Sequence, residues 1–261
     1  MDQRRVVLII LDGFGLVPRA EGNAIVSAKT PFFDYLIKEN RATSLHASGE
    51  AVGLPWGEMG NSEVGHLNIG SGRVVLQDYP QINQSIKDGS FYKNKVFLQA
   101  LNHAKHYKSR LHFIGLVSKG AVQAHIDHLY GLLKLAKMKD LKEVYVHAIL
   151  DGRDAPPRSA PNYLGTLLGF MAKENIGELS TMIGRYYAMD RDQRHDRIKV
   201  AYQALVEGNG TKIDNPLEAL EQAYHKGQTD EFMPPLIRSD YSRIRQNDAV
   251  IFFNFRAARA I

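Results

Sequence analysis

Residues 143–154 read EVYVHAILDGRD, and this stretch determines which fold the sequence predicts. Its apolar part is continuous, which is typical of a strand that helices cover on both faces. The charged turn DGRD follows at once. In parallel α/β sheets ligands bind beyond the carboxyl ends of the strands, so the stretch predicts a buried parallel strand that leads into a binding turn.

The same unit recurs along the chain as an apolar run, a polar turn and a segment of helical period. Apolar runs of strand length begin at Val6, Leu111, Glu143, Leu179 and Ala249. Helices are expected over residues 31–39, 95–107, 126–138, 160–174, 194–207 and 216–225. Strands that alternate with helices predict an α/β fold with parallel sheets.

The composition of the 261 residues is that of a folded globular protein, with 44% hydrophobic and 23% charged residues. The net charge of +5 is dispersed rather than clustered, which argues against nucleic-acid binding. The chain has no cysteine, which excludes disulfides and thiolate chemistry. Since no apolar run suits a signal peptide or a membrane span, we expect a cytoplasmic monomer that binds no membrane.

Charged and hydroxyl side chains are concentrated after the strand candidates. They are Asp12, Ser118, Asp151, Arg153, Asp154, Arg185, Asp190, Arg191, Arg256 and Arg259. Any one of these arginines is more often a solvated surface charge. Several arginines at one sheet edge would repel one another without an anion between them, so the group predicts a small phosphorylated or carboxylated substrate.

Asp12 and Ser62 are the candidates for metal and phosphoryl chemistry. A carboxylate at the end of a strand suits a divalent cation, although Asp12 could equally hydrogen-bond its own turn. Ser62 lies in MGNSEVGHLNIGSGR, residues 59–73, where it could bind a phosphoryl group or cap a helix, and the residues alone favour the cap.

His125 and His128 are three residues apart and lack the stronger zinc pattern, in which two histidines lie four residues apart with a glutamate between them. A structural role is therefore favoured for both histidines.

Several stretches together resemble the N-terminal half of the cofactor-independent phosphoglycerate mutases. They are ILDGFG, EGNAI, KTPFFDYL, ASGEAVGLPWGEMGNSEVGHLNIGSGRVVLQD, LDGRDAPPRSA, GRYYAMDRDQRHDR and FFNFRAAR. The resemblance implies part of an alkaline-phosphatase-like domain, residues 1–76, and an inserted α/β substrate-binding domain, residues 77–261. We therefore expect two domains, of which the first carries the metal and nucleophile residues.

The resemblance also implies an activity, the interconversion of 3-phosphoglycerate and 2-phosphoglycerate in glycolysis and gluconeogenesis. The reaction would pass through a phosphoserine and use two divalent ions, most often Mn²⁺, without 2,3-bisphosphoglycerate. Ser62 matches the nucleophile and a metal ligand, and Asp12 matches a metal-bridging carboxylate. The positions that match substrate-binding residues are Gln123, Arg153, Asp154, Arg185, Arg191, Arg256 and Arg259.

Three features depart from the family pattern. Gln123 stands where the family has a histidine, and glutamine cannot carry charge or shuttle a proton at neutral pH. Ala258 replaces an aspartate, and the chain ends at Ile261, well short of family length. We therefore expect a truncated form that lacks most of the metal ligands. The alternatives are a non-catalytic relative that binds phosphorylated acids, and a different phosphomonoesterase or phosphomutase of the alkaline phosphatase superfamily.

Overall fold

The structure is a computed structural model that describes residues 5–17 and 21–256. It divides the chain into two compact units, Met1–Gln77 and Asp78–Ile261. The described residues of the first unit form short helices joined by extended segments, whereas the second unit is built on one sheet. The α/β fold class predicted from the sequence is therefore confirmed in the second unit.

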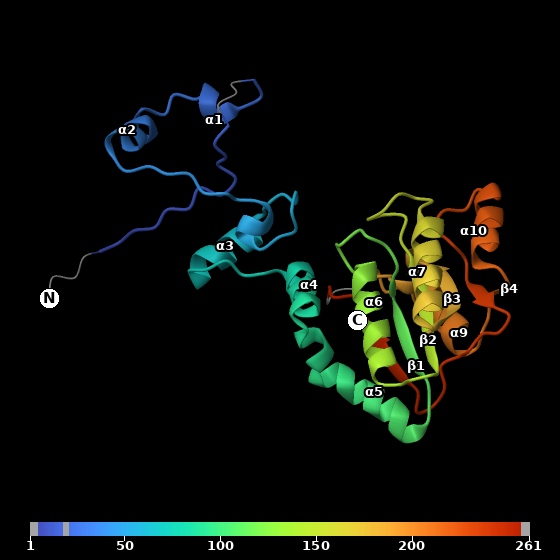
Figure 1. Ribbon diagram of the computed structural model, residues 1–261. Coiled ribbons are helices and arrows are strands. Elements are labelled where there is room, and N and C mark those ends of the chain that lie inside the picture. The colour runs from blue at the N-terminus through green and yellow to red at the C-terminus, as the bar shows by residue number, and fades with distance from the viewer. Residues whose placement is uncertain (1–4, 18–20, 257–261) are drawn as a thin grey trace. The chain divides into compact units, whose positions relative to one another are not determined.

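The sheet of the unit Asp78–Ile261 has six strands in the order β4-β5-β3-β2-β1-β6 (Figure 1). The strands are β1 (Leu111–Leu116), β2 (Val144–Leu150), β3 (Glu178–Gly184), β4 (Thr211–Ile213), β5 (Leu236–Arg238) and β6 (Ala249–Phe252). The four neighbours β3, β2, β1 and β6 run parallel. Their carboxyl ends therefore meet at one edge, where the turns that follow them are brought together.

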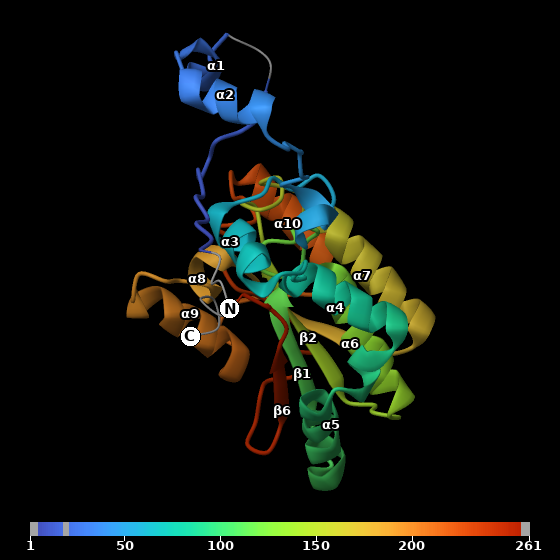
Figure 2. The same cartoon turned by 90° about the vertical axis from the view of Figure 1, so that its left-hand side faces the viewer.

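Helices cover both faces of this sheet (Figure 2). On one face lie α6 (Ile126–Met138) and α7 (Ala160–Glu174), and on the other lie α8 (Arg185–Ala188) and α9 (His195–Val206). The other helical elements are α4 (Asp78–Asp88), the 3₁₀ helix η2 (Ser90–Lys93), α5 (Lys95–Tyr107) and α10 (Pro216–His225). This cover explains why every residue of β1 is buried and why its sequence is a continuous apolar run.

The core of the second unit lies between the sheet and these helices. Phe113 and Leu116 of β1 and Ile149 of β2 are almost fully buried, and they belong to one cluster with Leu129 and Leu133 of α6. The two leucines are four residues apart, so they share the face of α6 that meets the sheet. Burial of each such side chain contributes about 1.5–3 kcal/mol.

The helix predictions agree closely with the structure. Five expected ranges coincide with α2 (Pro31–Glu39), α5, α6, α7 and α10, and the sixth corresponds to α9, which begins at His195. The side-chain oxygens of Asn94 and Asn215 accept N–H groups of the first turns of α5 and α10. Asparagine at the N-cap satisfies donors that a helix start leaves unpaired, so these two helices begin where the sequence places them.

The parallel arrangement expected from the sequence holds for β3, β2, β1 and β6 but not for the other side of the sheet. Strand β5 pairs antiparallel with β3, and β4 pairs parallel with β5. Each of these strands has three residues, which is too short to show a periodic pattern in the sequence. The sheet is therefore mixed, with a reversed pair of strands beside its parallel part.

The strand expected from Val6 to Leu11 is also wrong, since the structure assigns no strand there. The six apolar side chains are between 42% and 89% exposed. A strand is stable only when its backbone pairs with a neighbour, and the described residues of Met1–Gln77 contain no strand that could pair with it.

The unit Met1–Gln77 contains α1 (Ala24–Ser27), α2, the 3₁₀ helix η1 (Gly49–Val52) and α3 (Ser62–Ser71). A small cluster of Val52, Leu54 and Val64 joins η1 to α3. Gly53 has a φ of +84°, and a Cβ there would lie 2.1 Å from the carbonyl oxygen of Val75, so only glycine fits this turn. In the described part of the chain no helix is long and apolar enough to cross a membrane.

Candidate functional site

Ser62 and Asp12 are brought together although 50 residues separate them in sequence. The hydroxyl of Ser62 donates a 2.6 Å hydrogen bond to Oδ2 of Asp12. Ser62 is the first residue of α3, but the N-cap is Asn61, whose side chain accepts the backbone N–H of Val64 at 3.0 Å. The capping role is therefore filled by Asn61. The hydroxyl of Ser62 instead lies at a helix N-terminus, where the backbone dipoles favour an anion such as a phosphoryl group.

His66 lies one turn further along α3. Its Nδ1 is 2.8 Å from the backbone carbonyl oxygen of Ser62 and 3.3 Å from the Ser62 hydroxyl. A carbonyl oxygen can only accept, so Nδ1 carries the proton and donates it to the backbone. Asp12, rather than His66, is therefore the group placed to receive the hydroxyl proton of Ser62.

The described residues do not form a metal site. Asp12 and Ser62 supply only two side chains with oxygen ligands, whereas Ca²⁺ or Mg²⁺ takes about six or more ligands. The described ranges contain no group of three or more His, Cys, Asp or Glu side chains that could hold an ion. Two oxygen-bearing side chains are too few to hold a divalent ion, so the ligand role expected of Asp12 and Ser62 stays a prediction.

In the second unit, the turns after β2 and β3 meet through Asp151, Asp154 and Arg185. One guanidinium nitrogen of Arg185, Nη1, donates to Oδ1 of Asp151 at 2.6 Å and to Oδ2 of Asp154 at 2.7 Å. The Arg185 side chain is only 4% exposed. Burial would lower its pKa, but the hydrogen bonds and charges of Asp154 and Asp151 outweigh burial and raise the pKa. Arg185 is therefore a permanent, fixed cation.

A cavity of about 160 Å³ opens beside this cluster. Its charged lining consists of Arg153, Arg185, Arg191 and Arg197 together with Asp190, Asp192 and Glu231. Arg153 is 60% exposed and its Nη1 lies 3.8 Å from Glu231, and Arg191 is exposed as well. Exposed guanidinium groups around a small cavity can fork onto carboxylate or phosphate oxygens, so this cavity is the candidate anion site.

Gln123 lies in the loop after β1. Its side chain is buried, and its backbone carbonyl accepts the N–H of Phe255 at 2.9 Å. Within the described residues its Oε1 is buried without a hydrogen-bond partner. A buried acceptor without a partner costs free energy and is uncommon in folded proteins. The Oε1 atom of Gln123 is therefore able to accept a further hydrogen bond.

Arg256 is exposed beyond β6, and Arg259 and Ala258 lie outside the described residues. The structure thus brings Asp154 and Arg185 into contact and places Arg153 and Arg191 at the same cavity. It also pairs Asp12 with Ser62 in the other unit. The roles that the resemblance gave to all of these residues stay predictions.

Sequence reasoning missed the segment of residues 230–233. The backbone carbonyl of Glu231 accepts the N–H of Tyr186, and the carboxylate of Asp230 accepts the N–H groups of Ser159 and Ala160 at the start of α7. The segment follows no strand candidate, so no signal marked it. Asp151, in contrast, stands directly after a strand and was expected among the charged side chains at the strand ends.

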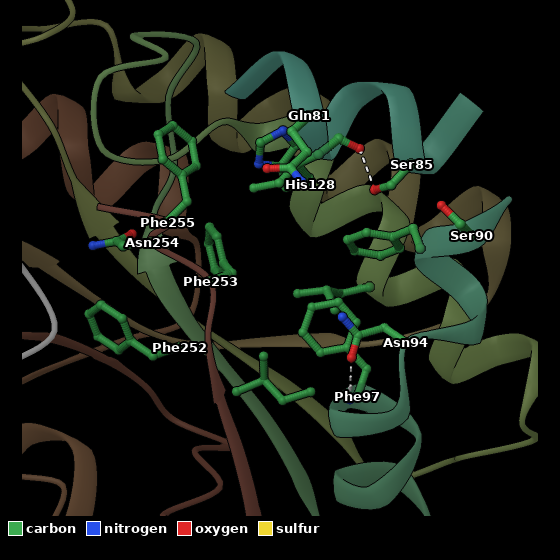
Figure 3. Close-up of a pocket in the computed structure, with 14 residues that line it drawn as sticks. Gln81, Ser85, Ser90, Asn94, Phe97, His128, Phe252, Phe253, Asn254 and Phe255 are labelled. Carbon is green, nitrogen blue, oxygen red and sulfur yellow. Dashed lines mark hydrogen bonds between the residues drawn. The ribbon is translucent and has the colours of Figure 1, made fainter. Parts of the chain in front are cut away.

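A larger cavity of about 440 Å³ lies beside β6 (Figure 3). Phe252, Phe253 and Phe255 line it along β6 and the residues that follow, with the ring of Phe253 toward the cavity and the ring of Phe252 on the other side of the strand. His128 from α6 lines it as well. Burial, and then the nearby His125, lowers the pKa of His128 to about 4. None of the described lining residues is a lysine, arginine, aspartate or glutamate. The cavity is therefore unsuited to a phosphorylated acid.

Comparison with known proteins gives a consistent result. The sequence model of the family described as "BPG-independent PGAM N-terminus (iPGM_N)" matches residues 82–261. A 2,3-bisphosphoglycerate-independent phosphoglycerate mutase of Clostridium perfringens is 50% identical over 264 aligned residues, which cover 100% of this chain and 52% of the relative. That of Moorella thermoacetica is 50% identical over 261 residues, which cover 98% of this chain and 51% of the relative.

Among solved structures, a phosphoglycerate mutase of Leishmania mexicana, crystallised at low cobalt concentration, matches with a TM-score of 0.74. It is 32% identical, and the match covers 96% of this chain and 48% of that protein. The chain thus spans about half the length of the curated relatives it matches. Family profile, sequence identity and fold agree, and the chain belongs to the 2,3-bisphosphoglycerate-independent phosphoglycerate mutase family, to whose N-terminal half it corresponds.

Proposed function

We propose that this protein interconverts 3-phosphoglycerate and 2-phosphoglycerate through a phosphoserine at Ser62. The observation that carries the proposal is the 2.6 Å hydrogen bond from the Ser62 hydroxyl to Asp12. It aligns a hydroxyl at a helix N-terminus with a carboxylate, in a chain 50% identical to phosphoglycerate mutases over its whole length. A serine hydroxyl is a weak nucleophile unless a neighbouring group takes its proton or lowers its pKa.

In the first half of the proposed reaction the Ser62 oxygen attacks the phosphorus of the substrate. The bond from phosphorus to the glycerate oxygen breaks, the Ser62 proton passes to Asp12, and the glycerate oxygen takes up a proton from water. In the second half the other hydroxyl of the retained glycerate gives its proton to water and attacks phosphoserine, the bond from phosphorus to the Ser62 oxygen breaks, and Asp12 returns its proton to restore the Ser62 hydroxyl. Such transfers depend mainly on positioning and on stabilisation of phosphoryl charge, which the N-terminus of α3 supports.

The cluster after β2 and β3 is proposed to hold the glycerate. Arg153 and Arg191 present exposed guanidinium groups to its carboxylate or phosphate oxygens, and Asp154 can accept a hydrogen bond from a hydroxyl. Two divalent ions, expected as Mn²⁺, are part of the proposal on the ground of family membership. Of the described residues only Asp12 and Ser62 are proposed as ligands, so the remaining ligands are not assigned.

The test is an enolase-coupled assay with added Mn²⁺ on the 261-residue chain and on the same chain joined to the C-terminal part of the Clostridium perfringens relative. The joined protein should turn over 3-phosphoglycerate, and Ser62→Ala should reduce the rate at least about a thousandfold. Ser71→Ala, at the other end of α3, is the matched control and should retain activity. Turnover that survives Ser62→Ala would refute the phosphoserine.

Two other outcomes would indicate the alternative functions. Calorimetric binding of 3-phosphoglycerate without turnover in the joined protein would indicate a non-catalytic relative that binds phosphorylated acids. Release of free phosphate from simple phosphate esters would indicate a phosphomonoesterase. The described residues favour the mutase because the glycerate-binding candidates and the nucleophile candidate are both present.

A further inference from the structure

The Asp151 carboxylate accepts hydrogen bonds from the segments that follow β1, β2 and β3, although the family resemblance gave it no role. Its side chain is 1% exposed. Oδ2 accepts the hydroxyl of Ser118 at 2.6 Å, which ties the turn after β1 to the turn after β2. Oδ1 accepts the backbone N–H groups of Arg153 at 3.2 Å and Asp154 at 2.9 Å. It also accepts Nη1 of Arg185 at 2.6 Å, which adds the segment after β3.

The contacts determine how the guanidinium of Arg185 is oriented. Both bonds to carboxylates are made by Nη1, while within the described residues no hydrogen bond is made by Nε or Nη2. A guanidinium is planar and donates in a fixed fork, so holding one nitrogen from two sides sets the plane of the whole group. Arg185 lines the 160 Å³ cavity, so its remaining N–H groups are the ones available to a ligand there.

Two glycines allow the backbone segments around Asp151 to approach closely. A Cβ at Gly120 would lie 2.8 Å from Cβ of Asp154 and 3.2 Å from Oδ2 of Asp151, so this glycine lets the turn after β1 meet the turn after β2. A Cβ at Gly152, which has a φ of +69°, would lie 2.6 Å from the backbone nitrogen of Glu231, so this glycine lets the turn after β2 meet the segment of residues 230–233. The Asp151 carboxylate adds hydrogen bonds that join the turns after β1, β2 and β3.

We propose that Asp151 is a positioning residue: it fixes the guanidinium plane of Arg185 so that the Nε and Nη2 edge meets the anionic group of the bound phosphoglycerate. The inference rests on the proposed function for the identity of the ligand only. The positioning role and simple charge repulsion predict opposite effects on anion binding when the Asp151 carboxylate is removed. A carboxylate near an anion site repels the anion, so its removal should strengthen binding, whereas loss of a positioning group should weaken it.

Asp151→Asn is the informative variant because it keeps the shape and most of the contacts. The amide oxygen can still accept from Arg153, Asp154 and Arg185, and the amide nitrogen can donate to the Ser118 hydroxyl. Only the charge is lost, and hydrogen bonds to a charged group are roughly twice as strong as neutral ones. Asp140→Asn, at an exposed position with a φ of +53° that asparagine tolerates, is the matched control.

The first measurement is calorimetric titration of the 261-residue chain with 3-phosphoglycerate. We expect the dissociation constant to rise about tenfold in Asp151→Asn, which corresponds to about 1.4 kcal/mol, and to be unchanged in Asp140→Asn. Ser118→Ala, which removes the hydroxyl bound to Oδ2, should also weaken binding. Unchanged or tighter binding in Asp151→Asn would overturn the proposal.

The second measurement needs no ligand and separates this inference from the proposed function. A guanidinium held between two carboxylates should give resolved NMR signals of slowly exchanging N–H groups, which Arg185→Lys identifies by their loss. In Asp151→Asn these N–H groups should exchange with solvent at least about tenfold faster. If the joined protein neither binds nor turns over 3-phosphoglycerate but this change occurs, the proposed function fails and the positioning role stands. If binding occurs and the signals are unchanged, the positioning role fails.

Discussion

The buried histidines of the sheet lead to a quantitative prediction about acid stability. His112 on β1 and His147 on β2 form a hydrogen-bonded chain whose Nδ1···Nε2 distance is 2.9 Å. At one end His112 Nε2 contacts Asp248 at 3.2 Å, and at the other His147 Nδ1 contacts the Thr181 hydroxyl at 3.0 Å. The Asp248 carboxylate can only accept, so each histidine donates through Nε2 and accepts through Nδ1 when both are neutral.

A proton added to this chain would put a positive charge into a buried site. Burial, and then the neighbouring His112, lowers the pKa of His147 to about 3 from its usual 6.5. Below pH 6.5 the unfolded chain therefore binds a proton that the folded chain does not, so this contribution to stability is complete above pH 6.5 and is lost as the pH falls towards 3. Between pH 7 and pH 5 the loss from His147 alone is about 2 kcal/mol.

The perturbation is His147→Gln, which removes the titrating group and keeps both hydrogen bonds. The glutamine amide can donate to His112 and its carbonyl oxygen can accept from Thr181. The free energy of unfolding is measured by urea titration at pH 7, 6 and 5 with linear extrapolation. Far-UV circular dichroism is the appropriate signal, because it reports directly on the helices and strands of the unit Asp78–Ile261, whereas the single tryptophan, Trp56, belongs to the unit Met1–Gln77.

The wild-type chain should lose about 2 kcal/mol more than His147→Gln between pH 7 and pH 5. His125 and His128 also have lowered pKa values, and they add the same acid sensitivity to both proteins. The pKa of His112 is lowered as well, but His112 contacts residue 147, so its contribution belongs to the pair. His106→Gln, an exposed position on α5, is the control and should follow the wild type. Parallel pH dependences of wild type and His147→Gln, within about 0.5 kcal/mol, would refute the reasoning.

Three further predictions concern the carboxyl edge of the sheet. Gly184→Ala should lower the free energy of unfolding by about 1–3 kcal/mol in urea titration, because its Cβ would lie 2.3 Å from the carbonyl oxygen of Glu231. Asp230→Ala should cost about 1–3 kcal/mol in the same measurement, because it leaves two N–H groups at the start of α7 without their acceptor; equal stability to wild type would contradict this. Gln123→Met should leave stability unchanged or raise it by up to about 1 kcal/mol, since the buried Oε1 has no partner in the described part of the chain. The same variant should weaken 3-phosphoglycerate binding in calorimetry, and unchanged affinity would remove Gln123 from the proposed site.

The sequence predicted which residues gather at the candidate site, but not which hydrogen bonds join them. The position of Arg153, Asp154 and Arg185 after strands predicted that they share one edge of the sheet, and Asp154 and Arg185 do meet there. The hydrogen bonds of Asp151 to three turns were not predictable, because they depend on how closely those turns approach. The segment of residues 230–233 follows no strand candidate, so its place beside the cluster was not predictable either.

The sequence by itself determined the parallel strands of the unit Asp78–Ile261 and its helices α5, α6, α7, α9 and α10, whereas α4, α8 and η2 were not expected. Their signals are local: a cap such as Asn94, an apolar period of 3.6 residues, and a continuous apolar run for a strand covered on both faces. Only the tertiary structure decided that β5 reverses against β3, that Val6–Leu11 forms no strand, and that Asp151 orients Arg185. Each of these depends on partners far away in sequence. A strand exists only where another backbone pairs with it, and a guanidinium takes its direction from the carboxylates that the fold brings beside it.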